Sequence, residues 1–453
     1  MAKNLTEGSP ARVILMFTLP LIAGNVFQQM YSVVDTLLVG RFLGVESLAA
    51  VGCTGSLMFL VIGFINGSTT GLSIRTGQYF GAKDADGVRR SAATCAVVGL
   101  FFSLVISAGG LLTCRPLLIM MQTPPEILDD AVRFISIVYG GALMTVFFFL
   151  QTNIIRALGD SRTPTVMLAL SLTVNIVLEP VVLLWLKWGV AGAALATVAA
   201  QAVGNAACLW FIWKKVPALH ARGADWRVTG RDFYEHLKIG LPMGFQTAVV
   251  AVGAIIVQVA LNQLGSLAVA AYAAAQKVDM IATMPILSFG MAMAAYTAQN
   301  YGARRLNRIR EGVAKCVLMS GGLSIIAGVL NFTFGPSMMR LFVGDGEVQV
   351  IEYGQTFLMI SSCFYVALAL MFIFRFTLQG LGQSVVPTIA GIMELIMRIV
   401  AAVFLADWYG YIGVCLSAPL AWIASCVPML IAWWHLRRTL VDKPLTGANL
   451  TGG

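Results

Sequence analysis

The segment QYFGA at residues 78–82 recurs 221 positions later as QNYGA at residues 299–303. Further pairs follow in the same order, with offsets of 221 to 223 residues: Leu19-Pro20 with Leu241-Pro242, Leu43-Gly44 with Leu264-Gly265, Leu158-Gly159 with Leu381-Gly382, and Gly192 with Gly413. A shared order with such constant offsets indicates an internal duplication. The sequence therefore predicts two halves with the same fold.

The composition places these halves in a membrane. The chain has 453 residues, of which 58% are apolar and 11% are charged, whereas a soluble domain is about half apolar and a quarter charged. Soluble, disordered and disulfide-rich secreted proteins are therefore excluded. The first apolar stretch, at about 12–39, is longer than the core of a signal peptide, so we expect it to be the first membrane helix.

Apolar windows long enough to cross a bilayer, about 20 residues each, recur along the whole chain. We predict twelve, near 12–39, 51–74, 91–113, 132–155, 164–186, 190–213, 239–262, 270–297, 313–337, 353–378, 386–406 and 411–436. This predicts an all-α integral membrane protein with two six-helix bundles. Because six is even, a pseudo-two-fold axis along the membrane normal would relate the bundles. The expected domains are 1–213, a linker at 214–238, a second bundle at 239–436 and a tail at 437–453.

The distribution of basic residues predicts the orientation. Lys and Arg concentrate in 75–90, 214–238 and 304–310, which lie on the same side of the predicted spans. The positive-inside rule places this side, and with it both termini, in the cytosol. The net charge of +9 then needs no nucleic-acid partner.

Four acidic residues fall within the predicted spans: Asp35, Glu179, Asp279 and Glu394. A charged side chain at the bilayer centre costs at least about 2.5 kcal/mol, so each is a functional candidate. Glu394 lies four residues before Arg398 and is expected to pair with it. Asp279, together with Lys277 and Asn153, is predicted to line a cavity.

Polar residues on three predicted helices meet at one depth in the outer half of the first bundle. They are Gln28, Tyr31 and Asp35 on the first helix, Asn175 and Glu179 on the fifth, and Thr197 on the sixth. Carboxylate, amide and hydroxyl oxygens suit a light cation. We predict that Asp35, Asn175, Glu179 and Thr197 form a cation-coupling site for H⁺ or Na⁺, with Gln28 and Tyr31 in support. A buried network that only pins the three helices is the alternative.

Two prolines at matched positions, Pro20 and Pro242, predict hinges. Each lacks the N–H that would bond to the carbonyl four residues earlier, so the first helix of each half is weakened at this point. A helix weakened in this way can bend while the two lobes move.

With these features the sequence resembles the multidrug and toxic compound extrusion (MATE) family over nearly its entire length. The resemblance implies a V-shaped cavity between two lobes, alternating access, and export of organic, often cationic, compounds across the plasma membrane of a prokaryote in exchange for H⁺ or Na⁺. In one prokaryotic branch the coupling site uses an Asp, an Asn-x-x-x-Asp and a Thr, and Asp35, Asn175, Glu179 and Thr197 match these positions. Glu179 is one methylene longer than the usual Asp, which leaves ion size and geometry open.

Other functions fit less well. No P-loop occurs, the histidines have no HExxH or CxxC context, and the eight cysteines never approach metal spacing. We therefore expect neither an ATP-driven pump nor an enzyme, and no cofactor besides the coupling ion. A lipid-linked precursor flippase is the alternative, but its diphosphate would need several cations, and we place only Lys277 and Arg398 inside the membrane. The expected partners are small organic substrates and the lipid bilayer, and we expect a monomer.

Overall fold

The structure, a computed structural model, describes residues 4–344 and 346–440, apart from the side chains of residues 31, 32, 35–37 and 45. These residues are almost entirely helical and include no strand. The first half contains α1 (Pro10–Leu43), α2 (Val45–Gly81), α3 (Ala85–Met120), α4 (Pro125–Gly140), α5 (Ala142–Ala157), α6 (Arg162–Pro180), the π-helical turn η1 (Val181–Trp185) and α7 (Gly189–Lys215).

Two short 3₁₀ turns, η2 (Pro217–Leu219) and η3 (Gly223–Trp226), lead to the second half. Its elements are α8 (Gly230–Gln263), α9 (Ser266–Gly302), α10 (Leu306–Val343), α11 (Val348–Cys363), α12 (Tyr365–Gly380), α13 (Val385–Val400), the π-helical turn η4 (Ala401–Leu405), α14 (Ala406–Tyr409), α15 (Tyr411–Cys415) and α16 (Ser417–Leu436). The predicted linker at 214–238 is too long, because helix α8 begins at Gly230. Thr229 and Asp232 cap that start reciprocally, so the polar first turns of α8 are helical although they are not apolar.

The prediction of twelve spans is confirmed. Within the described residues, ten helical stretches are long and apolar enough to cross a membrane, and two bent helix pairs bring the number to twelve. The predicted spans at 132–155 and 353–378 are these bent pairs, in which α4 and α5 meet at 49° and α11 and α12 at 51°. The first break falls at Gly140-Gly141, where a Cβ on Gly141 would lie 2.5 Å from the side chain of Val198. At the second break Tyr365 is fully buried.

The backbone confirms the duplication. Left-handed residues occur at matched places in the two halves, with φ values of 87° and 96° at Gly44 and Gly265 and of 85° and 82° at Gly159 and Gly382. The π-helical turns η1 and η4 also correspond. The two halves therefore share their turns and their helix irregularities as well as their helix order.

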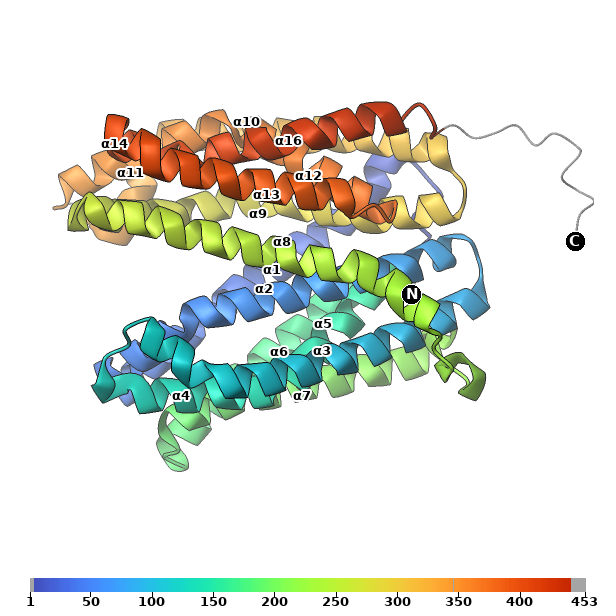
Figure 1. Cartoon of the computed structure of the whole chain (residues 1–453), viewed down its shortest axis with the longest axis horizontal. Helices are drawn as coiled ribbons and strands as arrows, with labels where there is room; N and C mark the ends of the chain where they lie inside the picture. Colours follow the sequence, from blue (N-terminus) through green and yellow to red (C-terminus); the bar gives the residue numbers. More distant parts are fainter. Residues whose placement is uncertain (1–3, 345, 441–453) are drawn as a thin grey trace, which may run out of the picture.

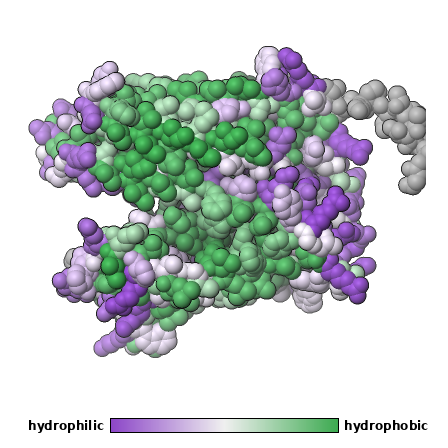
Figure 2. Space-filling view, viewed as in Figure 1, coloured by the Kyte–Doolittle hydropathy of each residue, from purple (hydrophilic) through white to green (hydrophobic). Residues whose placement is uncertain are grey.

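The two halves form lobes that meet at one end and diverge at the other (Figure 1). Figure 2 shows a cleft between the two lobes, at the end of the molecule where they diverge. Polar side chains gather at the two ends of the molecule and leave an apolar band between them. This is the surface expected of a protein that spans a bilayer.

At the closed end, helices α2 and α9 come into backbone contact. A Cβ on Gly81 would lie 2.0 Å from the carbonyl oxygen of Gln299, and a Cβ on Gly302 would lie 1.8 Å from that of Gln78. Real Cβ atoms do not approach backbone oxygens so closely. Only glycine therefore fits at these two positions, which are the glycines of the QYFGA and QNYGA repeats.

The first helix of each half crosses from one lobe to the other. Helix α1 begins with Ile14 and Phe17 packed in an apolar cluster of the second half, and near its end Val39 packs within the first half. Helix α8 does the reverse, starting with Phe233 and Leu237 against the first half and reaching the core of the second half at Val257 and Leu261.

The prolines of the predicted hinges lie between the two contacts of each crossing helix. The carbonyl of Pro20 accepts a hydrogen bond from Thr165 Oγ1 at 2.7 Å, which joins the crossing point of α1 to helix α6. The role of Pro20 and Pro242 as hinges stays a prediction.

Replacement of Gly81 or Gly302 by Ala is expected to destabilise the fold by about 1–3 kcal/mol or more, because the added methyl meets backbone that cannot move aside cheaply. The measurement is thermal unfolding of the purified protein in detergent. Gly321→Ala is the matched control, since nothing lies within 4 Å of its added Cβ. Equal melting temperatures for all three variants would contradict the close approach of α2 and α9.

Candidate functional site

Helices α1, α6 and α7 pack on one another and carry the predicted coupling residues. Asn175 and Glu179 on α6 are fully buried, and Thr197 on α7 is 8% exposed. The amide nitrogen of Asn175 donates to the hydroxyl of Thr197 over 3.5 Å. Tyr31 and Asp35 belong to α1, but their side chains lie outside the described residues, so the participation of Asp35 stays a prediction.

The chemistry of the described donors fits a light cation. The Oδ1 atom of Asn175 is buried and accepts no hydrogen bond from the described residues. The carboxylate of Glu179 lies one helical turn away on the same face, directly before Pro180 and the π-helical turn η1. No cluster of three His, Cys, Asp or Glu occurs in the described part of the chain. A cation here would depend on amide and hydroxyl oxygens together with the carboxylates.

Two adjoining pockets lie where the lobes meet, between α1, α2, α5 and α9. The pocket nearer the closed end is lined by Thr70, Ser73, Asn153 and Arg156, among others, and the pocket farther from it by Asn25, Gln28, Asn66, Thr152 and Arg156, among others. Met291 and Arg156 line both. Asn153, predicted to line a cavity, and Gln28, predicted to support the coupling site, thus lie at these pockets.

Asn153 connects two polar groups at the pocket nearer the closed end. It donates to Thr69 Oγ1 at 3.0 Å, and its Oδ1 accepts from Arg156 Nη1 at 3.1 Å. Lys277 and Asp279, the other predicted cavity residues, line neither pocket. Lys277 is exposed on α9.

Asp279 lies instead in a hydrogen-bond chain within the second lobe. Its Oδ1 accepts from the hydroxyl of Tyr365 at 2.7 Å, and that hydroxyl accepts from Asn331 Nδ2 at 2.9 Å. Helices α9, α10 and α12 are thereby joined at the break between α11 and α12. The carboxyl of Asp279 has a structural partner that sequence spacing could not reveal, because Tyr365 is 86 residues away.

Glu394 and Arg398 form the expected ion pair, with 3.2 Å between Oε1 and Nη2. A second arginine also contacts this carboxylate. Arg375 lies 2.8 Å from the other carboxylate oxygen of Glu394 and donates to Ser425 Oγ at 2.9 Å. Sequence spacing did not reveal this partner, because it pairs Glu394 only with the residue four positions later on the same helix. The available signal was an arginine inside the apolar run MFIFRFTL at 371–378.

Two symmetric hydrogen bonds hold the lobes together at the closed end. Gln78 Nε2, on α2, donates to the carbonyl of Gly380 at 2.9 Å, and Gln299 Nε2, on α9, donates to the carbonyl of Ala157 at 2.8 Å. The backbone N–H of Leu5 also donates to Gln299 Oε1 at 2.9 Å. Each glutamine therefore reaches from its own lobe to the last turn of a helix in the other.

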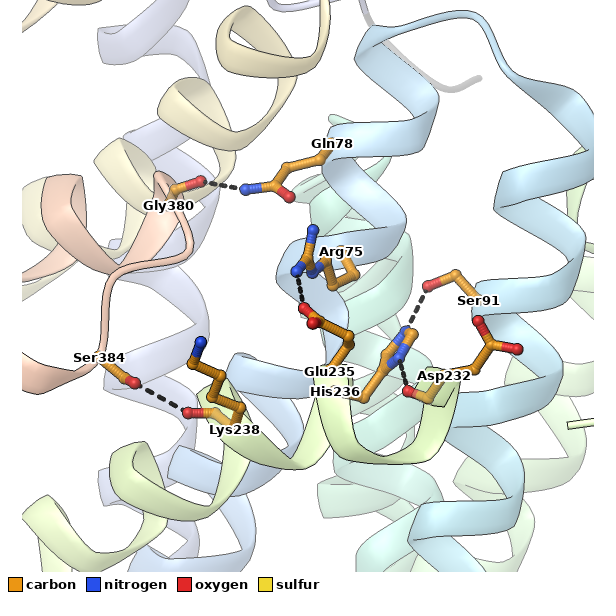
Figure 3. A network of polar contacts seen from close by, with 9 residues as sticks. All are labelled: Arg75, Gln78, Ser91, Asp232, Glu235, His236, Lys238, Gly380 and Ser384. Atoms are coloured by element: carbon orange, nitrogen blue, oxygen red, sulfur yellow. Dashed lines mark hydrogen bonds and ion pairs between the residues drawn. The ribbon is translucent and has the colours of Figure 1, made fainter. Parts of the chain in front are cut away.

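Figure 3 shows further contacts at this end, which bind the start of α8 to the first lobe. Arg75 on α2 forms an ion pair with Glu235. His236 lies 2.8 Å from Ser91 Oγ through Nε2 and 2.8 Å from the Asp232 carbonyl through Nδ1. The closed end is thus a polar seam on the same side as most of the basic residues.

The two halves each match one known family. Residues 20–181 and residues 242–404 match the MatE family, at starting points 222 positions apart. The chain is 27% identical to the probable multidrug resistance protein YoeA of Bacillus subtilis (strain 168), covering 98% of this chain and 97% of YoeA. It is 24% identical to the probable multidrug resistance protein YpnP of the same strain, covering 98% of this chain and all of YpnP.

Solved structures share the fold. A multidrug resistance MATE family transporter of the MOP superfamily, solved in an outward-facing conformation, superposes with a TM-score of 0.89 at 22% identity, covering 97% of this chain and 98% of that one. A MOP superfamily transporter from Pyrococcus furiosus, whose title describes a binding pocket of reverse polarity, gives 0.88 at 23% identity, covering 96% and 98%.

Replacement of both Gln78 and Gln299 by Ala is expected to populate a state that is open at the now closed end. Each lost hydrogen bond contributes about 1 kcal/mol, so the ratio of the two states should shift by roughly an order of magnitude or more. The measurement is the distance between nitroxides at the exposed positions 90 and 310, with Cys53 and Cys363 changed to serine. Gln258→Ala, an exposed glutamine, is the control. A distance distribution unchanged by the double substitution would show that the two bonds do not hold the seam.

Glu394→Gln is expected to lower the free energy of unfolding by about 3–5 kcal/mol, because it leaves two buried guanidinium groups without a counter-charge. Denaturation of the purified protein in detergent measures the change. Glu352→Gln alters an exposed acid and should have little effect. If Glu394→Gln and Glu352→Gln unfold alike, the three-charge group contributes nothing to stability.

Proposed function

This chain belongs to the MatE family, and we propose that it is a secondary active transporter that exports organic compounds from the cell in exchange for H⁺ or Na⁺. The observation that carries the proposal is the arrangement of the two duplicated lobes, which meet at a polar seam and diverge around a cleft at the other end. A second state, with the seam parted and the opposite end closed, would complete an alternating-access cycle.

The orientation follows from charge. The seam lies beside the basic segments 75–90 and 304–310, which the positive-inside rule assigns to the cytosol. The cleft then faces the outside of the cell, which is the state that releases an exported compound. The multidrug resistance relatives, matched over nearly their whole length, support a small-molecule cargo.

Coupling is assigned to the polar cluster on α1, α6 and α7. A cation that enters from the open cleft would bind Asn175, Glu179 and Thr197 together with Asp35. The buried Oδ1 atom of Asn175, which accepts no hydrogen bond from the described residues, would gain from such an ion. The ion drives export only if it stabilises one facing state more than the other. Helix α1 can make the stability of the two facing states depend on the ion, because it carries Asp35 and contacts both lobes.

A flippase for lipid-linked precursors is less well supported. The two pockets between the lobes contain a single cationic residue, Arg156, among the described residues that line them. Arg375 and Arg398 are already paired with Glu394. A diphosphate headgroup would find too few cations along this path.

Glu179→Gln and Asp35→Asn are each expected to reduce gradient-driven efflux about tenfold or more, since an amide cannot take up the ion that separates the two states. Efflux is measured in energised membrane vesicles at equal protein abundance, with the pH and Na⁺ gradients collapsed separately to identify the ion. Asp407→Asn, at an exposed acid outside the cluster, is the control. Undiminished efflux by both variants would remove this cluster from the mechanism.

A further inference from the structure

Arg156 occupies a distinctive position between the two lobes. It lies in the last turn of α5 and contributes to both pockets between the lobes. It is the only charged residue among the described residues that line these pockets. Every other lining side chain is apolar or neutral.

The guanidinium of Arg156 has no acidic partner among the described residues. Its one hydrogen bond is the 3.1 Å contact of Nη1 with Asn153 Oδ1, and its Nε atom is buried without a bond. A guanidinium that is largely withdrawn from water and has no counter-charge is costly to maintain, and Arg156 is partly buried. The arginines of the second lobe, Arg375 and Arg398, avoid this cost because both contact Glu394.

The fold does not explain the charge of Arg156. A cation in the last turn of a helix is favoured by the helix dipole, but the structure shows no bond from Arg156 to a backbone carbonyl. The internal repeat gives a direct comparison, because the matched position in the second half, 223 residues later, is Gln379. Gln379 is buried and bonds to Gln246 at 2.9 Å. A neutral residue therefore occupies the equivalent position in the second half, and the shared fold does not require a charge there.

The surroundings of Arg156 suit a ligand that has both an apolar part and an acidic group. Phe148, Phe149 and Met291 offer apolar contact, and apolar side chains cover much of the surface beside the cleft (Figure 2). Asn66 and Asn153 add neutral polar groups near the guanidinium. No acid lines these pockets within the described residues, so they offer nothing that would select the cationic compounds expected from the family resemblance.

We infer that Arg156 binds an acidic group of the transported compound, so that the substrates of this protein are amphipathic organic anions with one carboxylate or sulfonate. A planar guanidinium pairs with such a group through two parallel hydrogen bonds. The apolar part of the compound would lie along the wall of the cleft. This inference rests on the proposed function and names the substrate class of the same cleft.

The test compares two dyes that share the xanthene skeleton but differ in charge. Fluorescein is anionic at neutral pH and rhodamine 123 is cationic. Equilibrium binding to the full-length protein in lipid nanodiscs is followed by fluorescence anisotropy without any ion gradient. We expect the wild-type protein to bind fluorescein at least about tenfold more tightly than rhodamine 123, the scale of one charge-assisted contact.

Variants assign the preference to Arg156. Arg156→Gln should lose the preference for fluorescein and keep its affinity for rhodamine 123, and Arg156→Lys should retain most of the preference. Arg231→Gln removes an exposed arginine and should match the wild type. Unfolding temperature and monodispersity show whether each variant is folded. If Arg156→Gln is not folded, the comparison of the two dyes on the wild type and on Arg156→Lys still tests the preference for an anion.

Either of two results overturns the inference: equal or weaker binding of fluorescein by the wild type, or an unchanged preference when the charge at position 156 is removed. Because binding is measured without a gradient, both results are independent of the efflux assay on Asp35 and Glu179. Undiminished efflux by the Asp35 and Glu179 variants, with anion binding intact, would count against the coupling site alone. Intact efflux without anion binding would count against the substrate class alone.

Discussion

The architecture depends on the backbone contact between α2 and α9 at Gly81 and Gly302. Each glycine lies against a carbonyl oxygen of the facing helix, so no side chain separates the two helices. This places Gln78 and Gln299 within reach of the opposite lobe, where each bonds to the end of a broken helix. The closed seam, the open cleft and the position of the pockets between α5 and α9 all follow from this contact.

The sequence was sufficient to predict the duplication, the twelve spans and the paired turns, because these depend on local hydropathy and on residues such as Gly44 and Gly265. It was insufficient for the breaks between α4 and α5 and between α11 and α12. The second break follows Cys363, where no proline or glycine marks it. Its position depends on the burial of Tyr365 and on the bond to Asp279 from another helix. Such contacts between distant segments leave no periodic pattern in the sequence.

The candidate site was likewise predictable from the sequence only in part. Helical spacing predicts that Asn175 and Glu179 share one face of a helix, and in the structure Asn175 donates to the hydroxyl of Thr197 on α7. Spacing could not show that Arg375 turns into the bundle toward Glu394, because an arginine near the end of a span reaches either water or the protein interior. Only the packing of α12 against its neighbours decides between these outcomes. The same ambiguity applies to Arg156, which lies just beyond the predicted span at 132–155.

The exchange of α1 and α8 between the lobes limits how the molecule can move. Since each lobe holds the first helix of the other, neither can rotate while its counterpart stays still, and parting the seam strains both helices at once. If the seam parted at only one of the two crossing helices, the strain would not be released and contacts at the other helix would be lost. The transition should therefore be concerted, with few intermediates. A concerted transition would keep the membrane sealed against protons, because the seam would part only as the opposite end closes.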